Sequence, residues 1–67
     1  MNFDFGKALK KAQIDTGVRS VDLAAKLSVH KQQVARWRSL KDARIGLCEK
    51  LCDAMGIDLI TFMRGGL

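Results

Sequence analysis

The sequence contains no proline, only one histidine and two cysteines, and no long run of apolar residues. Without such a run we expect no membrane-spanning helix, and the acidic residue Asp4 does not suit a signal peptide. Structural zinc commonly takes four ligands, which His30 and the two cysteines do not supply. Cys48 and Cys52 lie one helical turn apart within an apolar stripe, where cysteine behaves as a small hydrophobic residue. We therefore expect a soluble protein without a metal site, a cofactor or a disulfide.

The chain has only 67 residues, which limits both its core and its chemistry. A domain of this size buries about 60% of the surface that its unfolded chain exposes, so a deep catalytic pocket is not expected. His30 has no accompanying set of acid and nucleophile, and it suits a helix cap or a phosphate contact better than a catalytic base. We therefore predict a single domain over residues 1–67, with no enzymatic activity and no small-molecule substrate.

Apolar residues recur with helical spacing in several segments, and no segment alternates between apolar and polar residues. The predicted fold class is therefore all-α, a compact bundle of about five short helices. Their expected positions are residues 4–16, a segment opened by Ser20, residues 31–39, residues 43–55 and residues 59–64.

Glycines and small polar residues mark the expected helix ends. Gly17 and Gly56 follow the first and fourth helices, where a left-handed residue commonly ends a helix. Ser20, Asp42 and Asp58 are the expected N-caps of the second, fourth and fifth helices. The buried stripe of the fourth helix is expected to consist of Ile45, Cys48, Cys52 and Met55.

The most informative segment is residues 18–41, in which two short helical patterns are separated by a brief turn. Leu23 and Leu27 share one face of the first pattern, and Val34 and Trp37 share one face of the second. This is the outline of a helix-turn-helix, whose second helix enters the major groove of DNA. We expect Val29 to fill the corner between the two helices, and Trp37 to be a core anchor.

The outer face of the second of these helices is polar. If Val34 and Trp37 point into the core, the turn of 100° per residue directs Gln32 and Arg36 outward and leaves Gln33 at a flank. Amide side chains can bind adenine, and guanidinium or ammonium groups can bind guanine, at the base edges of the major groove. Lys31, Gln32, Gln33 and Arg36 carry groups of this kind, and the family resemblance described below implies that these four residues read bases.

Positive charge is concentrated around the same helix. The stretch from Lys26 to Arg44 contains six basic residues and one acidic residue, Asp42. Its charge of +5 equals the net charge of the whole chain. A localised basic stripe favours a polyanionic partner, although a solvated helix face also explains many charge runs. The six bases are Lys26, Lys31, Arg36, Arg38, Lys41 and Arg44. The predicted phosphate contacts in this region are His30, Arg38, Ser39, Lys41 and Arg44.

Spaced residues along nearly the whole chain form a further pattern: Leu23-Ala24, Lys26-Leu27 and Val29, then Val34 and Arg36-Trp37, then Leu51, Ala54-Met55-Gly56-Ile57 and Leu59. This order resembles the phage repressor and Cro helix-turn-helix family, and most closely its stand-alone Cro-type proteins. The resemblance implies a DNA-binding regulator in the cytoplasm of a bacterial or phage-infected cell. It also implies base contacts from the residues that open the third helix, and a phosphate contact from Ser20.

Three positions depart from the family pattern. Ser28 occupies the turn position where glycine is usual, so it has to adopt a positive φ or a slightly different turn. Arg38 stands where the family commonly has an acid, and Leu40 where it often has a glycine. We expect Arg38 to strengthen phosphate binding and to remove an intramolecular ion pair.

The C-terminal segment offers more apolar surface than a short helix can bury on one side. We expect part of the surface formed by Leu59, Ile60 and Met63 to remain exposed and to join two copies in a weak homodimer. Such a dimer would place two recognition helices about 34 Å apart on a near-palindromic operator in double-stranded DNA. Two alternatives remain open: an antitoxin-type DNA-binding protein that also binds a toxin, and a helical protein-interaction module without a DNA role.

Overall fold

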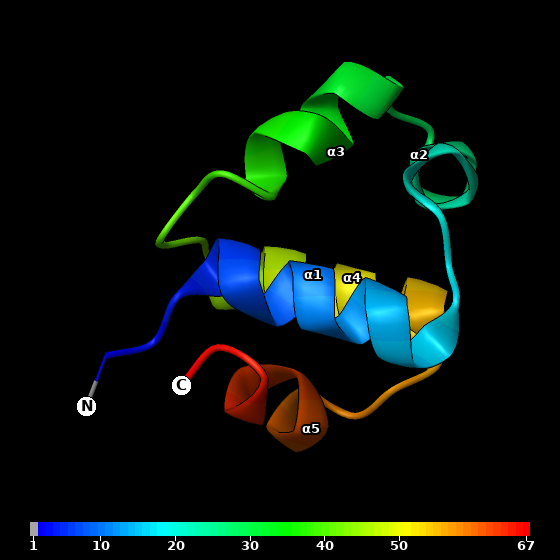
Figure 1. Ribbon diagram of the computed structural model, residues 1–67. Coiled ribbons are helices and arrows are strands. Elements are labelled where there is room, and N and C mark those ends of the chain that lie inside the picture. The colour runs from blue at the N-terminus through cyan, green and yellow to red at the C-terminus, as the bar shows by residue number, and fades with distance from the viewer. Residues whose placement is uncertain (1) are drawn as a thin grey trace.

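Five short α-helices make up residues 2–67, the part of the chain that the computed structural model describes (Figure 1). The helices are α1 (Phe5–Thr16), α2 (Ser20–Leu27), α3 (Lys31–Trp37), α4 (Ile45–Met55) and α5 (Leu59–Arg64). No strand occurs within these described residues. The predicted all-α bundle of about five short helices is therefore confirmed.

Helix α1 runs through the middle of the molecule, with α4 behind it, α5 on one side and α2 and α3 on the other (Figure 1). All five helices contribute to one core, in which the rings of Phe5 and Phe62 lie 6.0 Å apart between centroids. Val34 and Trp37 of α3 are buried, as predicted. The buried apolar residues are Phe5, Ala8, Leu9, Ala12, Leu23, Ala24, Val34, Trp37, Cys48, Leu51, Cys52, Met55 and Phe62.

The predicted buried stripe of α4 is wrong at one position. Ile45 is 55% exposed, whereas the other three residues of the stripe are buried. The helix begins at Ile45, and Arg44 is its N-cap. Ile45 therefore shares the angular position of the buried residues but lies at the free end of the helix.

Helix ends agree with the sequence where glycine or aspartate marks them. Gly17 and Gly56 both end their helices with a φ of 72°, in the left-handed region. The Asp58 carboxylate accepts a hydrogen bond of 2.8 Å from the Thr61 N–H and caps α5. Hydrogen bonds from the Thr61 side chain and backbone lower the pKa of the Asp58 carboxyl.

Two other predicted caps are wrong. Ser20 is the first residue of α2 and Arg19 is its N-cap, while the side chain of Ser20 is engaged by Gln13 of α1. Asp42 lies two residues before the N-cap of α4, because that helix starts later than its apolar pattern suggests. Helix α3 also ends two residues earlier than predicted, at Trp37.

The segment that leaves α3 is fastened to the beginning of α1. The N–H groups of Phe5 and Gly6 donate to the carbonyl oxygens of Lys41 and Leu40, at 2.8 and 2.7 Å. A Cβ atom at Gly6 would lie 2.8 Å from the Leu40 oxygen and closer still to that of Arg38. Only glycine allows this approach of the two backbones, so Gly6 fixes where the chain goes after α3.

Within residues 2–67, no helix has both the length and the apolar character needed to cross a membrane.

Candidate nucleic-acid interface

The turn before α3 sets the position of that helix. Ser28 adopts a φ of 57° and a ψ of 43°, so of the two expected alternatives, a positive φ or a different turn, the structure has the positive φ. Its N–H donates to the Ala25 carbonyl, and the N–H of Val29 donates to the Ala24 carbonyl at 3.0 Å. Val29 is half-buried and packs against the core at the corner, as predicted. The turn therefore holds α3 against α2 at a fixed place.

Helix α3 turns its apolar and polar sides in opposite directions. Trp37 is only 7% exposed, which confirms its role as a core anchor. Lys31, Gln32 and Arg36 are exposed, and Gln33 is half-buried. We call these four polar residues the α3 surface. Their arrangement places amide, ammonium and guanidinium groups along one short helix.

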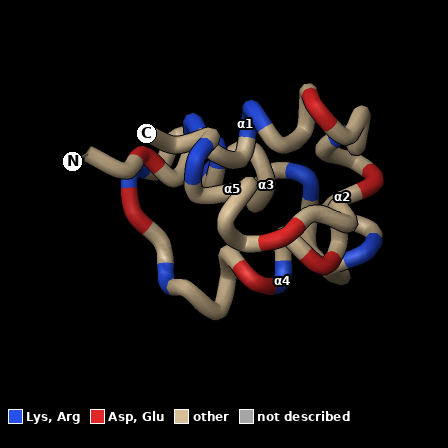
Figure 2. Tube along the Cα trace, turned by 90° about the horizontal axis from the view of Figure 1, so that it is seen from below, with Lys and Arg blue, Asp and Glu red and all other residues tan. Residues whose placement is uncertain are grey.

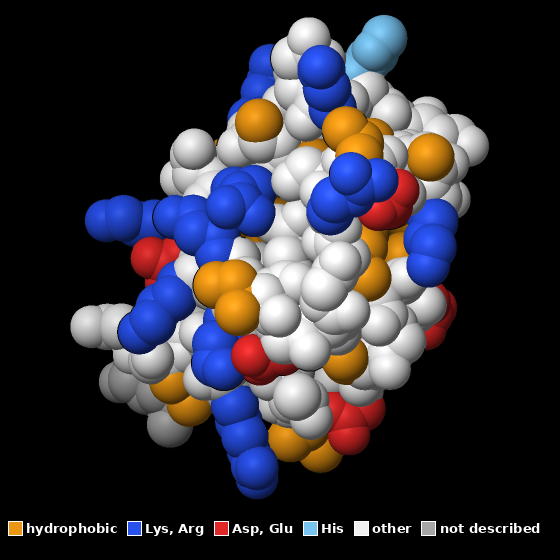
Figure 3. Space-filling model, turned by 45° about the vertical axis from the view of Figure 1, so that its right-hand side comes forward, with side chains coloured by type: hydrophobic (Ala, Val, Ile, Leu, Met, Phe, Trp, Pro, Cys, Tyr) orange, Lys and Arg blue, Asp and Glu red, His pale blue; other side chains and the backbone are white. Residues whose placement is uncertain are grey.

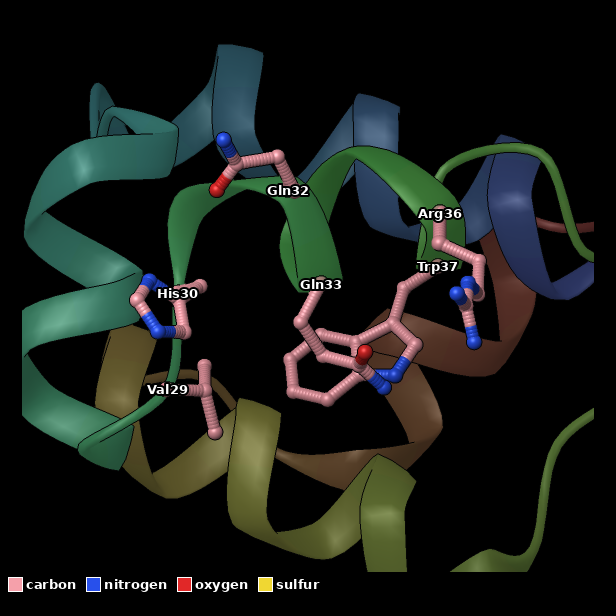
Figure 4. Close-up of a pocket in the computed structure, with 6 residues that line it drawn as sticks. All are labelled: Val29, His30, Gln32, Gln33, Arg36 and Trp37. Carbon is pink, nitrogen blue, oxygen red and sulfur yellow. The ribbon is translucent and has the colours of Figure 1, made fainter.

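Three of the four residues of the α3 surface meet at one hollow of about 620 Å³ (Figure 4). Gln33 extends along the ring of Trp37, and Gln32 projects away from Gln33. Lys31 is not among the residues that line the hollow, although it is exposed on the same helix. The residues that line it are Val29, His30, Gln32, Gln33, Arg36 and Trp37.

The predicted phosphate contacts fall into two groups. His30 is the N-cap of α3 and lines the hollow, while Ser39, Lys41 and Arg44 are exposed along the segment between α3 and α4. Ser20 and Arg38 form the second group. Both are half-buried, and both are hydrogen-bonded to the side chain of Gln13.

The sequence reasoning did not single out Gln13, which lies on the buried face of α1. Its amide Nε2 donates to the Ser20 hydroxyl at 3.1 Å and to the Val18 carbonyl at 3.3 Å, and its Oε1 accepts from Arg38 Nη1. The available signal was its position four residues after Leu9, on the stripe of α1 that faces the core. A polar residue on that stripe requires partners from other helices.

The electrostatic character of this region comes from an absence of acids. No acidic residue occurs between Asp22 and Asp42, a stretch that contains all of α3. In Figure 3 the His30 imidazole projects at the top of the molecule, and lysine and arginine side chains are spread over the face beneath it. Viewed from the side away from α3, acidic and basic residues are interspersed (Figure 2). Positive charge is therefore concentrated in the stretch of the chain that contains α3.

The helix N-termini differ in whether an acidic side chain caps them. Helices α1 and α5 are capped by the carboxylates of Asp4 and Asp58. Helices α2 and α4 instead follow Arg19 and Arg44, and neither has a side-chain cap among the described residues. The free N–H groups at such helix starts carry partial positive charge and favour anions. The sequence missed this feature because it assigned Ser20 and Asp42 as caps.

The two cysteines have no part in this surface. Both are buried free thiols of the core, as predicted. Burial raises the pKa of both thiols, that of Cys52 to about 11. They are therefore protonated and unreactive at neutral pH.

A separate apolar surface lies on α5. Ile60 is 66% exposed, and Leu59 and Met63 are half-buried beside it. These three residues, which we call the α5 patch, share a hollow of about 300 Å³ with Phe3, Leu67 and the exposed Arg64. The predicted exposure of apolar surface on the fifth helix is confirmed, and its use as a dimer interface stays a prediction.

Comparisons of the chain with family models, with curated proteins and with solved structures found no match. The chemistry of the α3 surface and of the α5 patch is therefore the basis for a function.

Proposed function

We propose that the protein is a sequence-specific, double-stranded DNA-binding transcriptional regulator of the Cro or repressor type, acting in the cytoplasm and without enzymatic activity. The observation that supports this most directly is the two-sided character of α3. Val34 and Trp37 anchor one side in the core, and Gln32 and Arg36 are exposed on the other. An anchored helix with free amide and guanidinium groups fits the dimensions and the donor and acceptor pattern of the major groove.

The spacing on α3 suits neighbouring base pairs. Gln33 and Arg36 are three residues apart, which is a rise of about 4.5 Å along a helix. Successive base pairs are separated by about 3.4 Å. In this arrangement Gln32 and Gln33 bind adenine, and Lys31 and Arg36 bind guanine, at adjacent positions of an operator.

Phosphate contacts on either side of α3 fix its register. Lys41 and Arg44 are exposed in the segment that Gly6 fastens to α1, so these cations are held at a defined distance from α3. Ser39 and His30 lie nearer to the helix itself. Contacts of this kind position a protein on DNA and carry no base information.

The α5 patch provides the means of pairing two copies. A single small module buries only about 600 to 1,000 Å² on DNA, and two modules on one site bind more tightly and more selectively. The patch is apolar, and Ile60 is its most exposed member. A weak twofold homodimer through Leu59, Ile60 and Met63 reads a near-palindromic operator.

The experiment is a selection of bound sequences from random duplexes, followed by titrations with the selected duplex and with a random one. Arg36→Ala should cost about 1 to 3 kcal/mol on the selected duplex and relax the preference at one base pair. Lys41→Ala should weaken both duplexes to a similar extent. Lys10→Ala, which removes a charge from the exposed side of α1, is the matched control and should change little.

The outcome also separates the alternatives. Equal losses on both duplexes for Arg36→Ala would contradict base reading by α3. Absence of salt-dependent DNA binding would favour a helical protein-interaction module, and co-purification of a toxic partner would favour an antitoxin.

A further inference from the structure

Gln13 is the only buried polar residue within residues 2–67, and it lies where α1, α2 and α3 meet. The whole residue is 7% exposed, and both the nitrogen and the oxygen of its side-chain amide are hydrogen-bonded. The partners are 5, 7 and 25 residues away in the sequence. One amide therefore connects the beginning of α2 with the end of α3.

The chemistry of the partners fixes the orientation of this amide. Arg38 can only donate a hydrogen bond, so it must face the carbonyl oxygen Oε1. The Val18 carbonyl can only accept, so it must face the nitrogen Nε2. The Ser20 hydroxyl lies at the same nitrogen and therefore accepts. Because one lone pair of Ser20 is used in this way, its own proton is directed to another acceptor.

Arg38 keeps its positive charge in this arrangement. The ion pairs found in the described chain are Lys11–Asp15 and Arg19–Asp22, and neither includes Arg38. The Gln13 amide is neutral, so it orients the guanidinium without neutralising it. A guanidinium has five N–H donors, and the remaining ones are free for an anion.

We propose that Gln13 is a positioning residue for the DNA backbone. It holds Ser20 and Arg38 so that the Ser20 proton and the free edge of the Arg38 guanidinium are both available to phosphate oxygens. The two phosphate contacts then act as one unit, although they lie on different helices. This inference rests on the proposed DNA binding and adds to it a residue that does not touch DNA.

Two substitutions of Gln13 separate positioning from folding. Gln13→Met keeps the volume and removes all three hydrogen bonds. The Arg38 side chain is then no longer held in place before DNA binds, so part of the binding free energy is needed to order it. We expect about a three- to tenfold loss of affinity for the selected duplex. Gln13→Glu retains an acceptor for Arg38 and adds an ion pair, which holds α1 and the end of α3 together, although its second oxygen replaces the donor that faces the Val18 carbonyl. It neutralises Arg38, however, and it accepts the Ser20 proton.

The salt dependence of binding is the readout that a purely structural role does not move. Gln13→Glu should be less stable, because a carboxylate oxygen then faces the Val18 carbonyl, but it should keep the same helical circular dichroism. The magnitude of its slope of log K against log salt should fall by about one unit. A second readout is a double-mutant cycle. The effects of Ser20→Ala and Arg38→Ala should shrink in the Gln13→Met background, while that of Ser39→Ala should be unchanged.

Each outcome has a definite meaning. Unchanged affinity and slope for Gln13→Glu, or additive effects in the cycle with Arg38→Ala, would overturn the positioning role while DNA binding itself stands. If Gln13→Met does not fold, Gln13→Glu alone decides the question. If the unmodified protein does not bind the duplex at any salt concentration, both the positioning role and the proposed function are overturned.

Discussion

Raising the salt concentration should weaken DNA binding steeply, and the structure sets the expected size of the effect. Lys26 is one of the six bases near α3, but its ammonium group donates to the Ala54 carbonyl of α4 at 2.9 Å. Five cations remain for the DNA, namely Lys31, Arg36, Arg38, Lys41 and Arg44. Each cation that enters the groove or contacts the backbone displaces condensed counterions, whether it binds a base edge or a phosphate, and contributes about −0.9 to the slope of log K against log salt. The slope should therefore be about −4.5 for each bound protomer.

This slope corresponds to a large change over an accessible range. Between about 50 and 200 mM salt the affinity should fall by about 500-fold. Fluorescence anisotropy of a labelled duplex, measured at several potassium chloride concentrations, gives the slope directly. Arg44→Ala should reduce its magnitude by about one unit, and Lys10→Ala on α1 should leave it unchanged. A slope between zero and about −1 for the unmodified protein would refute the electrostatic basis of the proposal.

Four further outcomes follow from the α5 patch, from the close approach at Gly6 and from the buried cysteines. Ile60→Lys should abolish self-association in sedimentation experiments while leaving the helical circular dichroism intact; unchanged association would place the interface elsewhere. Gly6→Ala should destabilise the fold by about 1 to 3 kcal/mol in urea unfolding, because its Cβ would push against the carbonyls after α3; an unchanged midpoint would contradict the close approach. Cys48 and Cys52 should resist thiol reagents at pH 8 until the protein unfolds. The folded state binds the Cys52 proton more tightly, so this contribution to stability should be lost as the pH rises from 9 toward 11; constant stability over that range would show that the thiol is not desolvated.

Local patterns in the sequence were sufficient for most of the fold. Helical spacing predicted that Val34 and Trp37 point inward, and the structure buries both. The left-handed conformation at Gly17 was also predicted, and that of Ser28 is one of the two conformations that the sequence allowed. These features depend on residues close together in the chain, where the geometry of the helix and of its turn leaves few choices.

The exposed side of α3 could be predicted from the sequence, whereas the hydrogen bond between Arg38 and Gln13 could not. The exposure of Gln32 and Arg36 follows from the buried stripe of α3, because a helix with one anchored side must expose the opposite one. The hydrogen-bond partner of Arg38 did not follow from the sequence. Its position suggested a free cation, whereas its guanidinium is hydrogen-bonded to a residue 25 positions away.

Approximate helix positions, most of the core-facing residues and the region of positive charge follow from the local order of residues. Which polar groups meet depends on how the helices pack. Ser20 has the chemistry of an N-cap, but the packing of α1 against α2 brings Gln13 to its hydroxyl, and Arg19 becomes the cap instead. Ile45 has the spacing of a core residue, but it lies at the open end of α4. Periodicity is a property of one helix, whereas a hydrogen bond between helices depends on how three of them pack together.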